Sequence, residues 1–448
     1  VRAMLTLLVA LACEAKPETA EPRGSGDSGE HAASGLPDTA PLAEVEVLVV
    51  GSGAGGLGAA WAAREAGASV LLVERDDRPG GASNNAANYW AVGTPEQAAA
   101  GITDSAEAAL AEWASFTEGD PTSPSVSDFV HGSAGVLAWL ESLGMAVRLG
   151  DNIPQDTGSV PRVHLVQGPS GPAPVEVATL LADVILYQTT ATGLILDGPR
   201  VAGMWVTDAN GAEAWVHARA TVLATGGFAR NDALVEAAIP ALAAQPAWYE
   251  AYPGMDGNGL TMARATAATF QNLDHLGLYS HGVEDAEVGQ PEVMVIAGLE
   301  STLIVDALGL RVEDERLFGS VSMGRRYLTE GPFYAVFDHD LWEATRIQGR
   351  GYNYESAPDE IEVSAPEYAA KHGAAESEDA EGLGVLLGID GEGLAATLAR
   401  YNEDAAAGAD TAFGKPAPWF AALETAPFHA LPLVLGRAKS AGGLATDA

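Results

Sequence analysis

The chain has 448 residues, and acidic residues outnumber basic ones by 61 to 23, which gives a formal net charge of -38. Hydrophobic residues make up 47%, which is enough for a globular protein of two or three domains. The negative charge repels the phosphates of nucleic acids and anionic membranes, so we expect neither as a partner of the folded part. The one cysteine, Cys13, excludes an intrachain disulfide and gives no support for a cysteine-ligated metal.

Residues 1–13 predict an export signal. Arg2 precedes a short apolar run at residues 4–12, which is too short to cross a bilayer. The junction before Cys13 resembles that of bacterial lipoproteins, in which the cysteine carries a lipid. Residues 14–44 are rich in Pro, Gly, Ser and Ala and predict a disordered linker. We expect an exported, lipid-anchored protein of the cell envelope or periplasm; a cytoplasmic protein with a wrongly assigned start is the alternative.

Residues 45–74 predict a strand, a helix and a second strand. Residues 45–50 are apolar and β-branched, which is typical of a buried parallel strand. Residues 57–66 are alanine-rich and helical in character, and a second apolar run at residues 69–73 ends at Glu74. Between the first strand and the helix, three glycines stand in G-x-G-x-x-G spacing: Gly51, Gly53 and Gly56.

This arrangement fits a dinucleotide site. Gly51 permits the tight turn, Gly53 lets the backbone approach a pyrophosphate, and Gly56 lets helix and strand pack closely. The helix N-terminus offers free N–H groups to that anion, and Glu74 can accept hydrogen bonds from a ribose. A glycine-rich turn in another α/β unit is the alternative. The residues predicted at this site are Gly51, Ser52, Gly53, Ala54, Gly55, Gly56, Glu74 and Arg75.

Three later motifs indicate which dinucleotide binds. The pair Gly80-Gly81 follows the ribose-binding acid, residues 220–228 form an apolar strand that ends in ATGG, and residues 257–259 read GNG. Together they resemble the FAD-dependent fumarate reductase and succinate dehydrogenase flavoproteins, a family that includes flavocytochrome fumarate reductases, urocanate reductases and 3-ketosteroid dehydrogenases. Residues 82–91 lack the histidine that carries covalent flavin in succinate dehydrogenases, so we expect non-covalent FAD.

The resemblance implies an α/β fold. A Rossmann-like FAD-binding domain would occupy residues 45–276, and an inserted α+β substrate-capping domain residues 277–440. Residues 441–448 resemble the start of the last FAD-binding segment, so we expect the recorded chain to be truncated. Asn258 stands where the family usually has aspartate. The further FAD-binding residues that the resemblance implies are Gly80, Gly81, Ala82, Ser83, Asn88, Ala224, Thr225, Gly226, Gly227 and Asn258.

Other elements follow from local patterns. Apolar residues recur at helical spacing over residues 102–116 and 128–143, and Gly144 ends the second helix. Residues 180–208 alternate as strands, and Asn210-Gly211 predicts a hairpin turn after them, as part of a small antiparallel meander. Residues 221–224 predict a separate buried strand. Arg162 and His164, in an R-x-H arrangement, are interpreted as structural.

The catalytic residues follow from the resemblance and its departures. Residues 302–315 resemble the family's G-x-R-F-x-N-E run. In fumarate reductases an arginine a few residues later donates the proton, but counting on from Glu315 reaches Gly319. Lys439 stands in place of a family histidine. These departures predict a substrate other than fumarate. The candidates are Lys439, His281, Arg311 and Tyr327, each with a purely structural alternative.

These observations predict an FAD-dependent dehydrogenase or reductase that transfers a hydride between flavin N5 and an activated C–C bond. Its partners would be a small-molecule substrate and an electron donor or acceptor that the sequence does not identify. One alternative is a 3-ketosteroid-type dehydrogenase, which would have an apolar pocket with paired tyrosines. Another is a non-catalytic remnant that binds flavin or is merely folded.

Overall fold

A computed structural model describes residues 33–85, 88–116, 122–150, 159–167, 173–246, 248–285, 292–349 and 361–446. Cys13 and the predicted signal lie outside the described residues. By its contacts the chain divides into two compact units. The described part of the first comprises residues 33–226, 257–271 and 444–446, and that of the second residues 227–256 and 272–443. The sequence places residues 227–256 in the FAD-binding domain, whereas the contacts join them to the second unit.

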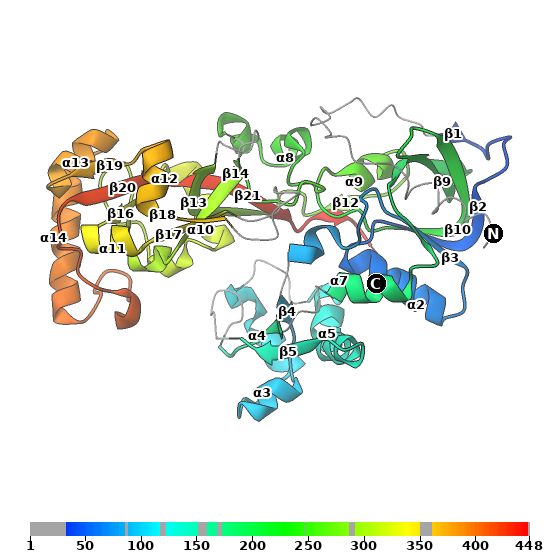
Figure 1. The fold of residues 1–448 in the computed structure, drawn as a ribbon, viewed down its shortest axis with the longest axis horizontal. Coiled ribbons are helices and arrows are strands. Elements are labelled where there is room, and N and C mark those ends of the chain that lie inside the picture. Colours follow the sequence, from blue (N-terminus) through cyan, green and yellow to red (C-terminus); the bar gives the residue numbers. More distant parts are fainter. Residues whose placement is uncertain are drawn as a thin grey trace. The chain divides into compact units, whose positions relative to one another are not determined.

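The first unit is built on a seven-stranded sheet (Figure 1). In order across the sheet, its strands are β1 (Ala33–Ser34), β8 (Thr189–Asp197), β9 (Arg200–Asp208), β10 (Glu213–Leu223), β2 (Ala43–Val50), β3 (Val70–Val73) and β7 (Ile185–Leu186). Strands β10, β2, β3 and β7 are parallel, whereas β8, β9 and β10 form an antiparallel meander. The predicted meander and the predicted strands flanking the glycine turn are therefore confirmed.

Helix α2 (Ala54–Glu65) connects β2 to β3 and buries Leu57 and Ala60 in a core with Val49 and Leu72. This is the predicted strand–helix–strand unit. The other helices of the first unit are α3 (Pro95–Ala99), α4 (Ala106–Phe116), α5 (Pro124–Ser142), α7 (Ala173–Leu180) and α9 (Asn258–Ala263). Its remaining strands are β4 (Asn88–Trp90), β5 (Ala146–Leu149), β6 (Val163–Gln167) and β12 (Phe270–Gln271), of which β4, β6 and β5 form an antiparallel sheet.

Residues 221–223 are in a strand, as predicted, but this strand is not separate from the preceding hairpin. Strand β10 runs unbroken over 11 residues, and it pairs antiparallel with β9 along its first half and parallel with β2 along most of its length. Residues 221–224 are half-buried rather than buried. The predicted hairpin is confirmed, since Ala214 pairs with Val206 and Trp215 with Trp205. A strand that is longer than its hairpin partner can pair with a second strand along its remaining residues.

The second unit contains a six-stranded and a four-stranded sheet. In order, the first has β11 (Trp248–Tyr249), β21 (Val434–Ser440), β13 (Leu276–Asp285), β14 (Glu292–Ala297), β17 (Arg346–Gly349) and β18 (Ile361–Ser364). The second has β15 (Leu303–Val305), β16 (Tyr334–Phe337), β20 (Phe428–Pro432) and β19 (Ala375–Ser377). Strand β22 (Gly443–Leu444) comes at the boundary between the units.

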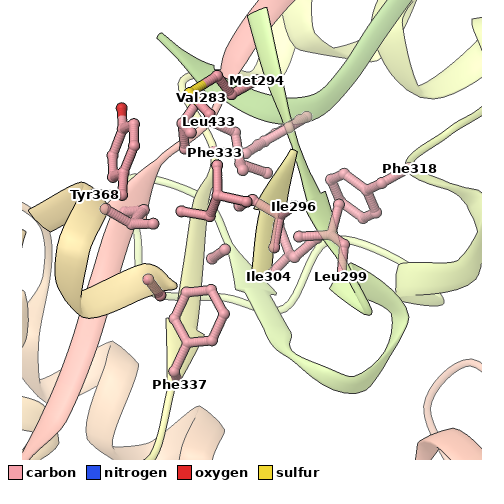
Figure 2. Packing of buried hydrophobic residues seen from close by; sticks show 14 of the residues in the cluster. Val283, Met294, Ile296, Leu299, Ile304, Phe318, Phe333, Phe337, Tyr368 and Leu433 are labelled. Atoms are coloured by element: carbon pink, nitrogen blue, oxygen red, sulfur yellow. The ribbon is translucent and has the colours of Figure 1, made fainter. Parts of the chain in front are cut away.

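The helices of the second unit are α8 (Asp232–Ala238), α10 (Val321–Glu330), α11 (His339–Ala344), α12 (Ala365–His372), α13 (Ala380–Leu387) and α14 (Gly391–Ala407). An apolar core joins residues of both sheets with those of α10, α11 and α12. Figure 2 shows Phe333, Ile296 and Phe318 within this core. No helix in the described ranges is both long enough and apolar enough to span a bilayer.

Candidate functional site

The glycine turn after β2 has no room for a side chain at Gly51 or Gly56. Gly51 has φ +94°, and a Cβ there would lie 2.5 Å from the carbonyl oxygen of Ala224. A Cβ on Gly56 would overlap the carbonyl oxygen of Gly51. Gly53 caps α2, and Ala54 and Gly55 at the start of that helix are exposed. The N-terminus of α2 is therefore exposed to an anion such as a pyrophosphate, although the Ala54 N–H already donates to the Ser83 hydroxyl.

Glu74, directly after β3, is hydrogen-bonded to the glycine turn. Its carboxylate is buried and accepts hydrogen bonds from the backbone N–H and the hydroxyl of Ser52, the first at 2.7 Å. Its other oxygen accepts from the Asp76 backbone N–H at 3.0 Å. A carboxylate has about four acceptor positions, so these three bonds leave capacity for a ribose hydroxyl. Glu74 thus fixes the turn and remains suited to its predicted role.

The paired-glycine loop lies against the same turn. The Gly80 N–H donates to the carbonyl of Ser52 at 3.0 Å, and the Ser83 hydroxyl accepts from the Ala54 N–H at 3.1 Å. Asn84, which the sequence analysis does not select, donates from Nδ2 to the Pro79 carbonyl at 2.6 Å. Among the residues that the structure describes, its buried Oδ1 has no hydrogen-bond partner. An acceptor of this kind requires an external donor, which a bound cofactor can supply.

The ATGG segment contacts the turn from β10. The Ala224 N–H donates to the Val50 carbonyl at 2.9 Å, and Thr225 packs so closely on Gly259 that a Cβ there would overlap its hydroxyl. Asn258 donates from Nδ2 to the Ala191 carbonyl at 3.1 Å. An aspartate cannot donate this bond, so the departure from the family pattern has a local use.

The predicted FAD residues therefore largely converge. The glycine turn, Glu74, the Gly80–Ser83 loop and the ATG of ATGG meet in the first unit. Asn88 begins β4, opposite Leu165, in the separate three-stranded sheet. Gly227 belongs to the second unit, where a Cβ would overlap the Ser440 hydroxyl. The turn that excludes side chains at Gly51 and Gly56 and the Asn84 oxygen fit an FAD, with Glu74 on its ribose and the α2 N-terminus on its diphosphate.

The second unit brings together two of the predicted catalytic residues. Gly277, Tyr279 and His281 alternate along β13, and Gly277 pairs with Lys439 on β21. The Lys439 ammonium nitrogen lies 5.5 Å from the centre of the Tyr279 ring. That ring lies 5.3 Å from the His281 ring, centre to centre. Tyr279 is not among the sequence candidates, although its position two residues before His281 on a strand was a usable signal.

A carboxylate completes this group. Nε2 of His281 lies 3.0 Å from Oε2 of Glu250, whose side chain is 1% exposed. A Cβ on Gly319 would lie 3.5 Å from Nδ1 of His281. We refer to Glu250, Tyr279, His281 and Lys439 as the polar cluster. No local pattern identifies Glu250, which follows β11, 31 residues before His281. No group of three or more His, Cys, Asp or Glu among the described residues is arranged to hold a metal ion.

Tyr327 has packing contacts on α10. Its hydroxyl donates to the Leu433 carbonyl at 2.9 Å, and its ring packs edge-on against Phe333. Burial, with a smaller contribution from Tyr334, raises the pKa of Tyr327 to about 12. A hydroxyl that is buried, already donating and weakly acidic is poorly suited to proton transfer.

Arg311 lies in a buried ionic network. Its guanidinium donates to Glu315 at 2.8 and 2.9 Å and to Asp410 at 2.9 Å, and Lys415 donates to Glu315 at 2.9 Å. Burial alone would lower the pKa of Arg311, but the hydrogen bonds and charges of Glu315 and Asp410 raise it above its ordinary value. Burial lowers the pKa of Lys415, against the attraction of Glu315. The network joins the segment after β15 to the loop after α14.

Arg162 and His164 also have structural contacts. Arg162 donates to both oxygens of Asp104 at 2.8 and 2.9 Å and pairs with Glu112. His164 is fully buried, with Nε2 2.8 Å from the Thr94 hydroxyl and Nδ1 3.1 Å from the Arg162 carbonyl. Both ring nitrogens are thus satisfied within the first unit.

Residues 46–448 match the FAD binding domain family. The chain belongs to this family. It is 26% identical over 417 residues to a probable fumarate reductase, Ifc3, of Shewanella frigidimarina (strain NCIMB 400), covering 91% of this chain and 66% of that protein. It is 27% identical over 422 residues to a fumarate reductase (cytochrome) of Shewanella frigidimarina, covering 91% and 69%. The chain thus spans about two thirds of the length of these relatives.

A solved structure has the same fold. The 3-ketosteroid-Δ4-(5α)-dehydrogenase from Rhodococcus jostii RHA1, in complex with 4-androstene-3,17-dione, matches with a TM-score of 0.69 at 24% identity. The match covers 92% of this chain and 87% of that chain. The predicted family, the α/β fold and the FAD cofactor are confirmed, and the class of FAD-dependent oxidoreductase is confirmed at the level of the family.

Proposed function

We propose that the chain is an FAD-dependent oxidoreductase that acts on a C–C bond activated by a neighbouring carbonyl or carboxylate. The polar cluster carries this proposal. It joins a cation, a histidine and an aromatic ring on two paired strands, and Lys439 and His281 are two of the four catalytic candidates. When bound, FAD supplies or accepts the hydride, so the chain itself must bind the substrate and move a proton.

Three members of the cluster have a direct role in this proposal. Lys439 holds the electron-withdrawing end of the substrate, because an ammonium group stabilises the negative charge that develops there. Tyr279 forms an aromatic wall beside it, and His281 exchanges the proton. Arg311 and Tyr327 support the second unit rather than the reaction, since both are committed to contacts within the protein.

The substrate we propose is not fumarate. The support comes from Gly319, which lies beside His281 at the position where the resemblance calls for the proton-donating arginine of fumarate reductases. A 3-ketosteroid is the second candidate. It is favoured by the tyrosine in the cluster and by the fold shared with a ketosteroid dehydrogenase.

Anaerobic titration of the bound flavin tests the proposal. We expect the purified protein to show the absorption bands of oxidised flavin, and acid precipitation to release FAD because the cofactor is non-covalent. The chemically reduced protein is then mixed with fumarate, an aryl enoate or a 3-keto-4-ene steroid, and the oxidised protein with the saturated counterparts. One class other than fumarate should change the flavin spectrum. Bound flavin that responds to no class would indicate a non-catalytic remnant, and fumarate as the best acceptor would refute the substrate assignment.

We also propose that a lipid on Cys13 anchors the protein on the outer side of a membrane, in the cell envelope or periplasm. The support is the basic residue Arg2, the apolar run at residues 4–12 and the small residue before Cys13. One acyl chain binds a membrane reversibly, whereas several acyl chains on one cysteine hold it firmly.

A further inference from the structure

Glu250, Tyr279 and Gly319 lie around the His281 ring. Its Nε2 lies 3.0 Å from the Glu250 carboxylate. One face lies against Tyr279, with 30° between the ring planes. Its Nδ1 points toward Gly319, where a Cβ would lie 3.5 Å away with no other atom of the described residues within 4 Å, apart from the chain neighbours of Gly319. The ring therefore has one nitrogen committed to the protein and one beside a position without a side chain.

The backbone of β21 places Glu250 for this contact. The Glu250 N–H donates to the Arg437 carbonyl at 3.0 Å, which extends the pairing of β11 with β21. Gly436, on the same strand, lies beside the carboxylate: a Cβ there would make an ordinary contact of 3.4 Å with Oε2 and a tight one of 3.1 Å with a Val293 methyl carbon. Glu250 reaches His281 past Gly436, the β21 residue that pairs with Tyr279 of β13.

The chemistry of the pair fixes the proton on one nitrogen. An ionised carboxylate can only accept hydrogen bonds, so Nε2 of His281 must carry the hydrogen that it donates to Glu250. In the neutral ring the lone pair is then on Nδ1, the nitrogen on the Gly319 side. In the protonated ring Nδ1 also carries a hydrogen and becomes a donor toward that side.

We propose that Glu250 is a positioning residue that fixes His281 in the Nε2–H tautomer, so that Nδ1 exchanges the proton with the substrate carbon. This rests on the proposed function. In the reductive direction the hydride that bound, reduced FAD would supply forms a C–H bond at one carbon of the C=C bond. The electron pair of the double bond moves to the neighbouring carbon, which takes the proton as the Nδ1–H bond of the imidazolium breaks. His281 is left neutral, with Nε2–H still donating to Glu250, and the two electrons of the hydride would come from FAD. In dehydrogenation each step is reversed.

The tautomer can be read directly by ¹⁵N NMR of the holoprotein with labelled histidine at alkaline pH, where the ring is neutral. His281→Gln assigns the signal among the nine histidines. We expect wild-type His281 to be predominantly Nε2–H, and Glu250→Gln to give a mixture, because an amide can donate as well as accept. Glu250→Asp, which keeps the charge, should retain the tautomer if its carboxylate still reaches the ring.

Kinetics provide the second readout, with the substrate that changes the flavin spectrum. His281→Gln should lower kcat by about 10²- to 10⁴-fold, the usual contribution of a general acid or base. Glu250→Gln should lower kcat by roughly tenfold or more, with KM little changed. Glu292→Gln is the matched control, because it alters another buried carboxylate of the same sheet, which pairs with Arg230 instead of His281.

The two proposals fail in different ways. A wild-type ring in the Nδ1–H form, or a Glu250→Gln protein with unchanged tautomer and kcat, would overturn the role of Glu250. If Glu250→Gln does not fold, the tautomer of wild-type His281 and the Glu250→Asp variant still test the role of Glu250. A flavin that no substrate class reduces or reoxidises would defeat the proposed function, whatever tautomer His281 has.

Discussion

Lys439 lies at the edge of the polar cluster, exposed on β21, with its ammonium nitrogen 5.5 Å from the centre of the Tyr279 ring. The chain has few lysines for its size, and Gly277 faces this one across the strand pair, where a Cβ would lie 2.7 Å from the Lys439 Cγ. A glycine opposite a long side chain lets that side chain lie flat over the neighbouring ring. A cation held in this way is suited to binding an anionic or carbonyl group of a substrate.

Lys439→Met tests this role at the level of the residue. We expect kcat/KM to fall by about 100-fold, because a charge that stabilises the transition state is lost while much of the side-chain volume is kept. The flavin spectrum should be unchanged, since the FAD-binding candidates other than Gly227 lie in the first unit. Lys371→Met, at an exposed lysine of α12, is the control and should keep full activity. Unchanged turnover in Lys439→Met would remove this lysine from the site.

At the level of elements, the buried ionic network explains why an arginine can match a family pattern without taking part in the chemistry. Arg311 follows β15, and its two carboxylate partners come from the next turn of chain and from the loop after α14. The guanidinium also lies over the rings of Tyr401, Phe413 and Phe420. It therefore holds three segments of the second unit together.

Arg311→Met should destabilise the second unit strongly. Removing the Arg311 guanidinium leaves the buried Asp410 carboxylate without its cation, and leaves Glu315 paired with Lys415 but not with Arg311. We expect this loss to cost about 3–5 kcal/mol of unfolding free energy. Urea denaturation measures the change. Arg346→Met, at a largely exposed arginine, should cost less than about 1 kcal/mol. A variant of normal stability that had lost turnover would instead place Arg311 in the reaction.

The loss of folding stability in Arg311→Met should depend on pH. Burial would raise the pKa of Asp410, but its hydrogen bonds from Arg311 and nearby backbone N–H groups lower it below the ordinary value. A carboxylate with a lowered folded pKa stabilises the protein above its unfolded pKa, and this contribution is lost as the pH falls toward the folded pKa. The stability gap between wild type and Arg311→Met should therefore narrow below about pH 4.

At the scale of the whole molecule, most of the FAD-binding candidates and the polar cluster lie in different units. The first unit contains the glycine turn, Glu74 and the paired-glycine loop that fit FAD, and the second contains the polar cluster.

The proposed lipid anchor is also a property of the whole molecule. Blocking lipoprotein signal peptidase in the producing cell should leave a larger precursor, because cleavage before Cys13 requires the modified cysteine. Cys13→Ser should also leave an uncleaved precursor, in this case without the lipid, and release the protein from the membrane fraction. Equal mass with and without the inhibitor would favour the alternative of a cytoplasmic protein.

The sequence by itself determined the nucleotide-binding unit of this protein. Strand and helix periods, the glycine spacing and the acid at Glu74 are local patterns, and positive φ at Gly51 is a property of one residue. The tertiary structure alone decided what surrounds the substrate candidates. His281 finds Glu250 across 31 residues and Arg311 finds Asp410 across 99, since strand order and loop packing bring these charges together. Partners of buried charges depend on which segments become neighbours, and no spacing along the chain records that choice.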